Sequence, residues 1–496
     1  MANQKRDDSY SHVLKYTSIF GGVQGLNILI GLVRNKLVAL LLGPEGMGLA
    51  SLFQSTASFI SQATNLGIPM SAVKHIAELY EAGEEERICH FVKVVRVWSL
   101  LTALAGTLLC MLIGPLLNAL TFSWGDHTLH FLTLSPLVAL LAFTGGETAI
   151  LKGTHQLRPL AVIQICNVFV ALIVSVPVYY LWGQTGIIPV MVLVSAINLL
   201  LVINRSYRLY PLQLKHAGSI LGEGMDMVRL GIAFTLAGIL GTGAEMFIRS
   251  WMNVTGDLDL VGLYNAGYMI TITYSGMVFS AMEVDYFPRL SSVNRDVLAA
   301  NEVVNRQIEV SLLIISPMLV GLIIGLPILI PLLFSQMFLP VVPMTQVAAI
   351  AMFFKAVTLP IAYITLARGS SLVYLLQEGV YFVVFVLLIV AGYRHWGLTG
   401  TGIAITAANV FDFLMINVVA RWRYGYKMSS AVMRYSAVHI LIGLLALFTT
   451  VTVDGYIYWV FGIGLTAVST LLSFIVLHQK SHLWDALLRR FRSSRA

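Results

Sequence analysis

The chain has 496 residues, of which 57% are hydrophobic and only 11% are charged, and its net charge is +7. An ordinary soluble domain has about a quarter of its residues charged, so this composition excludes a soluble globular protein. The three cysteines, Cys89, Cys110 and Cys166, are far apart in the sequence, which indicates neither a disulfide framework nor a cysteine-rich metal site.

Long apolar runs recur along the whole chain, each long enough to cross the hydrocarbon core of a bilayer as a helix. The runs are continuous and do not alternate with period two, which favours helices over a β-barrel. The sequence therefore predicts an all-α membrane protein with about fourteen transmembrane helices. The predicted spans are 14–42, 46–68, 92–114, 129–151, 158–181, 185–204, 228–253, 260–284, 308–334, 341–367, 371–393, 398–420, 434–453 and 456–478.

The basic residues are distributed very unevenly between the two sides of these spans. Most of the 31 Lys and Arg residues fall on the side that holds the N-terminus, including Lys74, Arg96 and Arg421. Acidic residues such as Asp257 and Asp454 fall on the other side. By the positive-inside rule, this asymmetry predicts an inner-membrane protein with both termini in the cytoplasm. We expect the amphipathic, arginine-rich tail after residue 480 to lie on the anionic lipid surface, and no nucleic-acid partner is expected.

An internal repeat links the two halves of the chain. The motif Trp-Gly-Gln-Thr-Gly at 182–186 recurs as Trp-Gly-Leu-Thr-Gly at 396–400, at an offset of 214 (396 minus 182), and the same offset maps Gly48 onto Gly262. A third match, Lys152-Gly153-Thr154 with Arg368-Gly369-Ser370, has an offset of 216. Because six spans separate the copies, both copies enter the membrane in the same direction, as in transporters that bind substrate between parallel repeats. The alternative is that such short motifs are simply common at helix ends.

The repeat divides the chain into three parts. Residues 1–222 form a predicted N-lobe of six helices, and residues 223–426 form a C-lobe of six more. Residues 427–496 add two helices and the basic tail. The predicted architecture is therefore two pseudo-symmetric six-helix lobes with a two-helix extension.

Four cations within the predicted spans are the main candidates for substrate binding: Arg34, Lys36, Arg249 and Lys355. A charge at the bilayer centre costs about 3 kcal/mol, so it needs a partner or an aqueous cavity. The repeat offset places Arg34 and Lys36 at positions 248 and 250, on either side of Arg249. Such a set suits an anionic substrate, because Arg binds phosphate in a bidentate way and Lys acts as a point charge. The alternative for Arg34 and Lys36 is that their side chains extend to the membrane surface.

Three acidic residues within the spans, Glu245, Glu378 and Asp412, are candidates for ion or proton coupling, or for pairing with these cations. Glu245 lies four residues before Arg249 on one helical face, so the two could simply neutralise each other. Glu147 is close to Lys152, which favours a structural role. No metal-ligand spacing, glycine-rich phosphate loop or nucleophile motif is present, so we expect no cofactor, no metal, no direct use of ATP and no enzymatic activity.

Several segments resemble the Wzx-type flippases of lipid-linked oligosaccharides, which belong to the MOP exporter superfamily and include O-antigen translocases and the lipid III flippase. The run Asn-Lys-Leu-Val-Ala-Leu-Leu-Leu-Gly-Pro-Glu-Gly-Met-Gly-Leu at 35–49 resembles the end of their first helix and the following turn. The segments 285–290, 354–357 and 374–378 resemble their eighth, tenth and eleventh helices. The similarity extends to about residue 425, and Lys36, Arg249 and Lys355 match basic positions of the family.

The resemblance implies two six-helix lobes around a cavity that opens alternately to each side of the membrane. It implies that the substrate is an undecaprenyl-pyrophosphate-linked oligosaccharide of the O-antigen or lipid III type, moved to the periplasmic leaflet for lipopolysaccharide or related polysaccharide biosynthesis. Membrane lipids and other polysaccharide-assembly proteins are further expected partners. The last two helices exceed the twelve-helix members, and their expected role is either a groove for the lipid tail or simple packing.

Three other functions compete with this one. An ion-coupled exporter of small molecules would have the same superfamily fold but a site dominated by carboxylates. A peptidoglycan-precursor flippase would differ only in its family motifs. A membrane polymerase or ligase would carry a sizeable outside loop with catalytic residues, and the predicted outside loops are short.

Overall fold

The computed structural model describes residues 2–121, 128–211 and 220–480, so the predicted surface helix after residue 480 lies outside the described residues. All the regular secondary structure in these ranges is helical, which confirms the all-α prediction. The elements in chain order are α1 (Ala2–Thr64), α2 (Ile68–Ala82), α3 (Glu85–Thr121), α4 (Thr128–Gly153), α5 (Leu157–Trp182), η1 (Gly183–Gly186), α6 (Ile187–Leu209), α7 (Ile220–Thr255), α8 (Leu258–Tyr268), η2 (Met269–Tyr274), α9 (Ser275–Ser292), α10 (Val297–Leu333), η3 (Gln336–Val341), α11 (Val342–Ala367), α12 (Ser371–Tyr424), α13 (Ser430–Thr452) and α14 (Gly455–Lys480).

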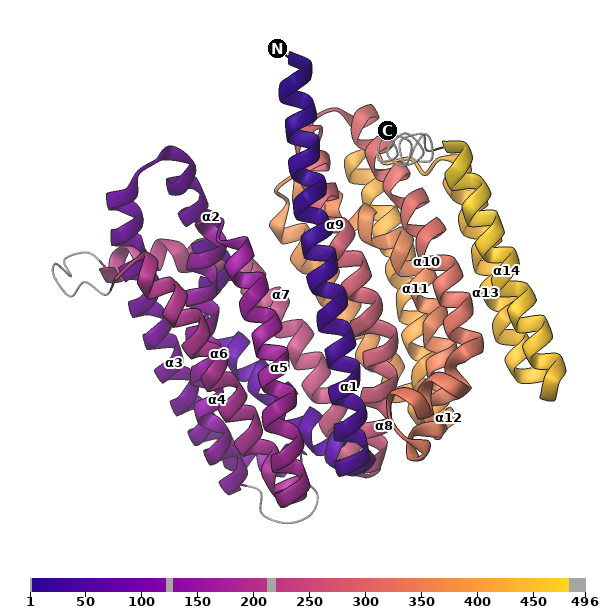
Figure 1. Cartoon of the computed structure of the whole chain (residues 1–496), viewed down its shortest axis with the longest axis horizontal. Coiled ribbons are helices and arrows are strands. Elements are labelled where there is room, and N and C mark those ends of the chain that lie inside the picture. Colours follow the sequence, from indigo (N-terminus) through magenta and orange to yellow (C-terminus); the bar gives the residue numbers. More distant parts are fainter. Residues whose placement is uncertain (1, 122–127, 212–219, 481–496) are drawn as a thin grey trace, which may run out of the picture. The chain divides into compact units, whose positions relative to one another are not determined.

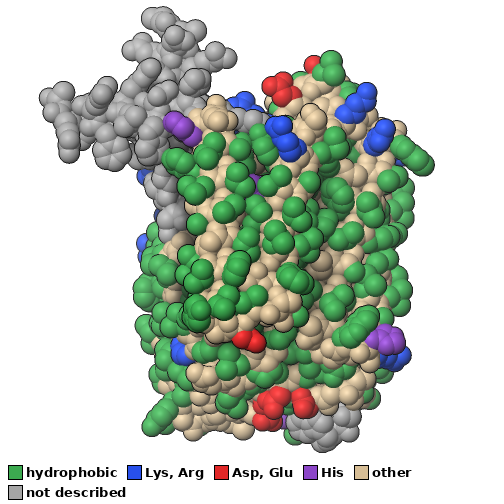
Figure 2. Space-filling view, turned by 90° about the vertical axis from the view of Figure 1, so that its right-hand side faces the viewer, with side chains coloured by type: hydrophobic (Ala, Val, Ile, Leu, Met, Phe, Trp, Pro, Cys, Tyr) green, Lys and Arg blue, Asp and Glu red, His purple; other side chains and the backbone are tan. Residues whose placement is uncertain are grey.

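The helices have the length and composition of membrane spans. Nine stretches of the described chain are long and apolar enough to cross a bilayer. The stretches 158–209 and 371–424 each contain two predicted spans, and the stretch 25–64 overlaps two more. Figure 2 shows one face of the molecule, on which hydrophobic side chains cover the middle and charged side chains gather toward the two ends. The chain is therefore a multi-pass membrane protein, and the count of fourteen spans stays a prediction.

Glycines set the breaks between consecutive spans. α1 is interrupted at Gly43, whose φ of 66° and ψ of −172° are accessible to glycine but strained for other residues, and Pro44 follows at once. Proline is well placed here, because the first turn of a helix does not need its missing N–H. α12 is interrupted in the same way at Gly397, with φ 58° and ψ −143°.

The predicted repeat recurs in the backbone. α4 and α11 have 26 residues each, and both ends of α11 follow those of α4 by 214 positions. Gly183 adopts φ 55° and ψ −131°, nearly the conformation of Gly397 at the equivalent position. The match between residues 152–154 and 368–370 has an offset of 216 in the sequence, but the structure fits 214 here too. The residue with left-handed backbone after α4 is His155 (φ 54°), and its counterpart after α11 is Gly369 (φ 68°). The internal repeat predicted from the sequence is therefore present in the backbone.

The described helices form two compact units. Unit 1 comprises Met1–Asn265 with Leu332–Met337. In it α3 packs on α4, α4 on α6, and α1 on α5, while α7 packs against α1, α2 and α3. The repeat assigns α7 to the second lobe, whereas its contacts place it in unit 1. The predicted lobe boundaries at 222 and 426 stay predictions.

Unit 2 comprises Ala266–Pro331 with Phe338–Ala496. Its centre is the pair α11 and α12, with α9 and α13 against α11 and with α14 beside α13 (Figure 1). An apolar groove of about 650 Å³ separates α14 from α10, and Gly321 and Gly325 on α10 make room for it. On the α14 side, Trp459, Ile463 and Ala467 line this groove.

Candidate functional site

Arg34 and Lys36 lie on α1 in unit 1, before the break at Gly43. Arg34 Nε is 3.4 Å from Ser175 Oγ on α5, and its side chain also hydrogen-bonds Tyr179 one turn further along. Both cations are half-buried. Residues two apart on a helix face different directions, so Arg34 faces α5 while Lys36 points away from this contact.

Arg249 is buried on α7, also in unit 1. Its Nη1 donates to Glu245 Oε2 at 3.0 Å and lies 3.3 Å from the Glu245 carbonyl oxygen, and its Nη2 is 3.4 Å from Asn265 Oδ1. The Glu245 side chain is 40% exposed, whereas that of Arg249 is 7% exposed. The predicted i, i+4 pair is thus present, and the guanidinium is held in a fixed orientation by a carboxylate and an amide.

Lys355 lies near the middle of α11 in unit 2, where it faces both halves of α12. Its Nζ is 4.0 Å from Asp412 Oδ2 and 5.7 Å from the centre of the Tyr381 ring. The Asp412 side chain is only 7% exposed, whereas that of Lys355 is 34% exposed. The break at Gly397 makes this arrangement possible, because it folds α12 so that Tyr381 and Asp412, on opposite sides of the break, reach the same lysine.

Glu378 completes this group. It is half-buried on the first half of α12, hydrogen-bonds the Tyr374 side chain, and lies within electrostatic reach of both Lys355 and Asp412. One ammonium group therefore lies beside a carboxylate and a tyrosine ring, with a second carboxylate within electrostatic reach, and we call these four residues, Lys355, Glu378, Tyr381 and Asp412, the lysine cluster. Such a group can bind an anion at the lysine, or can move a proton between the carboxylates and the lysine.

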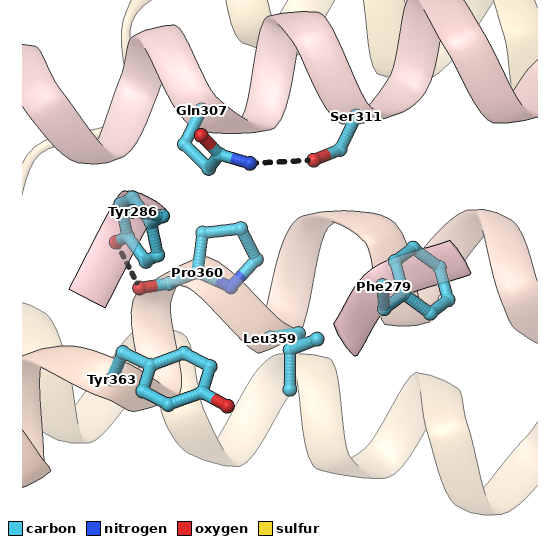
Figure 3. A pocket seen from close by; sticks show the side chains of 7 residues that line it. All are labelled: Phe279, Tyr286, Gln307, Ser311, Leu359, Pro360 and Tyr363. Atoms are coloured by element: carbon cyan, nitrogen blue, oxygen red, sulfur yellow. Dashed lines mark hydrogen bonds between the residues drawn. The ribbon is translucent and has the colours of Figure 1, made fainter. Parts of the chain in front are cut away.

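A small cavity lies next to Pro360 of α11, the helix that carries Lys355 (Figure 3). It has a volume of about 10 Å³, roughly the space for one water molecule. Tyr286 on α9 donates its hydroxyl to the Pro360 carbonyl oxygen at 2.6 Å, and Gln307 Nε2 is 3.4 Å from Ser311 Oγ on α10. Tyr286 thereby ties α9 to α11 at the proline.

A buried ion pair in unit 1 was not predicted from the sequence. Arg96, which the topology count assigns to a cytoplasmic segment, is 6% exposed within α3 and pairs with Glu147 on α4 at 2.9 Å. Its other nitrogens donate to the Tyr210 carbonyl oxygen and to Ser206 Oγ. The guanidinium also stacks on Tyr207, 3.9 Å from the ring centre. Arg96 is therefore buried between helices and is the partner of Glu147, for which the sequence points only to the nearby Lys152. The cytoplasmic side assigned to Arg96 stays a prediction.

The structure brings some predicted site residues together and keeps others apart. Lys355, Glu378 and Asp412 form one cluster in unit 2, and Arg249 forms a pair with Glu245 in unit 1. Arg34 contacts α5 instead. No group of three or more His, Cys, Asp or Glu side chains suited to a metal ion occurs in the described ranges. The role of each of these residues in transport stays a prediction.

Comparisons with solved structures identify the fold. The chain is similar to a structure described as "Lipid II flippase MurJ, inward closed conformation", with 15% identity and a TM-score of 0.69, covering 93% of this chain and 98% of that one. It is also similar to an inward-facing multidrug resistance MATE family transporter of the MOP superfamily, with 15% identity and a TM-score of 0.64, covering 84% and 99% of the two chains. The fold is therefore that of the MOP superfamily.

Sequence comparisons give a narrower grouping. One relative is the "Stage V sporulation protein B" of Bacillus subtilis (strain 168), 24% identical over 153 residues. That match spans less than a third of either protein, at 31% of this chain and 29% of the relative. The family described as "Polysaccharide biosynthesis protein" matches residues 13–294, which is more than half of the chain. The chain belongs to the polysaccharide biosynthesis protein family.

Proposed function

We propose that the chain is a flippase that moves an undecaprenyl-pyrophosphate-linked oligosaccharide, an O-antigen-type or lipid III-type repeat unit, from the cytoplasmic to the periplasmic leaflet by alternating access. The observation that carries this proposal is the set of cations within the spans, above all Lys355 with its partly exposed side chain. Membership of the polysaccharide biosynthesis family supports a substrate of this class.

The chemistry of this substrate explains why such cations are needed. A sugar pyrophosphate cannot cross hydrocarbon, because each unsatisfied polar group costs several kcal/mol there. Arg34, Lys36, Arg249 and Lys355 would offset that cost by pairing with the pyrophosphate as it moves. Arg249 is well suited to a bidentate contact, since Glu245 and Asn265 already fix the plane of its guanidinium.

Lys355 is the group that we expect to bind the pyrophosphate most directly. Its distance of 4.0 Å from Asp412 is too long for a strong hydrogen bond, so the ammonium is paired only loosely. A pyrophosphate carries more charge than one carboxylate and would compete with Asp412 for the lysine. Without the lysine as a partner, Asp412 and Glu378 would bind a proton more readily, because a nearby cation stabilises the charged carboxylate. Proton uptake coupled to substrate binding is a route by which a proton gradient could drive the cycle.

The apolar groove between α10 and α14 would hold part of the prenyl tail. It is lined by α10 and by α14, the second of which follows the first twelve predicted spans, and its lining is almost entirely apolar, which suits a long isoprenoid chain and not a charged head group. The tail would stay in contact with lipid while the head group crosses the interior of the protein.

The setting follows from the same proposal. The protein would lie in the inner membrane with both termini in the cytoplasm, would act as a transporter and not as an enzyme, and would require no cofactor. Its partners would be the lipid-linked oligosaccharide, the surrounding membrane lipids and other proteins of polysaccharide assembly.

The test replaces the cations one at a time in a cell that depends on this protein for its surface polysaccharide. Lys355→Ala, Arg249→Ala and Lys36→Ala should abolish or strongly reduce the surface glycan and should accumulate lipid-linked single repeat units, while the protein remains in the membrane. Arg423→Ala, which removes an exposed basic side chain at the end of α12, serves as the control and should leave the glycan unchanged. Full glycan production by the three cation variants would exclude the proposed site.

A second candidate is an ion-coupled exporter of small molecules, because the fold is shared with MATE transporters and because carboxylates surround Lys355. This function predicts that deletion of the gene increases sensitivity to cationic drugs and leaves the surface glycan intact. The fold is equally shared with a lipid II flippase, so rescue of a cell depleted of its peptidoglycan-precursor flippase would favour that substrate instead.

A further inference from the structure

The first repeat carries uncharged amides at the positions where the second repeat carries the lysine cluster. At the repeat offset, Asp412 corresponds to Asn198, Glu378 to Gln164, and Tyr381 to Asn167. Lys355 itself corresponds to Leu141. Every ionisable member of the cluster thus has a neutral counterpart in unit 1, and three of the four counterparts carry a side-chain amide.

The backbone supports this correspondence at the level of single residues. The glycine breaks at Gly183 and Gly397 have nearly the same dihedral angles. A side chain at Gly186 would meet the backbone of Val178, and a side chain at Gly400 would meet the backbone of Gly392, which is the same contact shifted by the repeat offset. α4, α5 and α6 also pack on one another in unit 1, so the repeat assigns Gln164, Asn167 and Asn198 to positions equivalent to those around Lys355.

A fourth amide joins this group from α1. α1 packs along α5, with Arg34 beside Ser175, and about two helical turns before these residues stand Asn27 on α1 and Asn167 on α5. The Oδ1 atoms of both asparagines are buried and accept no hydrogen bond from any described residue. Two neighbouring helices therefore present unsatisfied amides at about the same depth.

These amides need a polar partner. A buried amide without a hydrogen bond costs about 1 to 3 kcal/mol, and polar side chains within a membrane protein face its interior or an aqueous cavity and not lipid. An amide both donates and accepts hydrogen bonds, as a sugar hydroxyl does, and carries no charge. The group is therefore suited to the hydroxyls of a glycan and poorly suited to a pyrophosphate.

We propose that Asn27, Gln164, Asn167 and Asn198 form a sugar-binding subsite in unit 1, which we call the amide subsite, and that it hydrogen-bonds the hydroxyl groups of the oligosaccharide. This inference rests on the proposed function and deepens it. The amide subsite would bind the neutral sugar, a role distinct from the pyrophosphate contact proposed for Lys355.

The test compares two defined probes on the purified full-length protein in lipid nanodiscs: undecaprenyl pyrophosphate without a sugar, and undecaprenyl pyrophosphate carrying one N-acetylglucosamine. The wild-type protein should bind the sugar-bearing lipid more tightly. The single variants Asn167→Leu, Asn198→Leu and Gln164→Leu should each weaken binding of the sugar-bearing lipid by about tenfold, the value of one lost hydrogen bond in such a site. Their affinity for the sugarless lipid should not change.

Two further variants make the result specific. Lys355→Ala should weaken binding of both lipids to a similar extent, because it removes the pyrophosphate contact. Thr133→Val on α4, whose hydroxyl donates to carbonyl oxygens of its own helix, should change neither affinity. Leucine suits these variants because it is close in size to asparagine and is favourable in a membrane interior. Gln164 is exposed, so Gln164→Leu can be assayed even where a buried variant does not fold.

The outcomes separate the inference from the proposed function. If the wild-type protein binds the two lipids equally, or if the leucine variants keep the preference for the sugar-bearing lipid, the amide subsite is excluded while the proposed function stands. If the leucine variants lose affinity for both lipids alike, their role is structural and the inference fails. If the wild-type protein binds neither lipid better than plain phospholipid nanodiscs do, the proposed function itself fails.

Discussion

Gly48 and Gly262 occupy equivalent positions in the two repeats, and each lies directly against the backbone around the other. A Cβ atom on Gly48 would overlap the Leu258 carbonyl oxygen and lie 2.9 Å from the Gly262 nitrogen, and a Cβ atom on Gly262 would overlap the Pro44 carbonyl oxygen. Positions 44 and 258 are themselves related by the repeat offset. The contact between α1 and α8 is thus reciprocal, because each glycine meets the segment equivalent to the one that its partner meets.

Substitution of either glycine should therefore destabilise the protein. Gly48→Ala and Gly262→Ala each force two backbones apart, which should cost about 1 to 3 kcal/mol, the usual effect of overpacking. Thermal unfolding of the purified protein, followed by size-exclusion chromatography after heating, would measure the loss. Gly464→Ala on α14 is the control, because no atom lies within 4 Å of its added Cβ and alanine favours helix. Equal melting temperatures for Gly48→Ala and Gly464→Ala would contradict the contact.

The sequence contains enough information to predict the repeat and the helical fold, but not all the pairings between helices. Apolar runs give the spans directly, and the motif at Trp182 locates a break that the backbone repeats at Trp396. The lysine cluster is also predictable in part, since a lysine deep in a span needs a nearby carboxylate. Which carboxylate it is depends on how α12 folds at Gly397, and no local pattern specifies that.

Arg96 shows a different limit of sequence reasoning. It stands close to the cytoplasmic end of a predicted span, where the positive-inside rule expects solvated basic residues. Hydropathy places a residue along the membrane normal but does not distinguish a side chain that faces solvent from one that faces a neighbouring helix. The one sequence signal that could have indicated its burial is Glu147, an acid within a predicted span that needs a cationic partner.

The buried pair of Arg96 and Glu147 should be far more sensitive to single substitutions than to a double one. Arg96→Met or Glu147→Leu alone leaves an uncompensated buried charge and should cost about 3 to 5 kcal/mol. The double variant removes both charges, so it should be more stable than either single variant. Melting temperatures of the three variants give the comparison.

The control for this pair is the exposed ion pair of Arg87 with Glu84, at 2.7 Å, whose side chains are 74% and 40% exposed. Removal of either partner there should cost at most about 1 kcal/mol, because solvent screens exposed charges. A double variant of Arg96 and Glu147 that is less stable than both single variants would show that the charge pair is not the dominant interaction.

Tyr286→Phe should loosen the attachment of α9 to α11. The change removes the only hydroxyl that donates to the Pro360 carbonyl oxygen in the described residues, next to a cavity that holds no more than one water, while the ring remains (Figure 3). A hydrogen bond of this kind contributes about 1 kcal/mol, so the melting temperature should fall by a few degrees. Tyr456→Phe, at a tyrosine that is 79% exposed, should leave it unchanged. An unaltered melting temperature for Tyr286→Phe would mean that water satisfies the carbonyl equally well.

Filling the groove between α10 and α14 should slow transport without unfolding the protein. Ala467 lines the groove, and tryptophan at this position would occupy much of its volume of about 650 Å³. Val468, the next residue of α14, does not line the groove and is 47% exposed, so Val468→Trp places the same large side chain on the same helix outside the groove. If the groove holds the prenyl tail, Ala467→Trp should reduce surface glycan severalfold and accumulate lipid-linked repeat units, whereas Val468→Trp should do neither. Equal glycan levels in the two variants, at equal amounts of protein in the membrane, would assign α14 a packing role and place the tail elsewhere. The apolar lining favours loss of glycan in Ala467→Trp, because binding of the prenyl tail would remove apolar surface from other contacts. A tail held in the groove would also keep the lipid-linked substrate attached to the protein throughout the cycle.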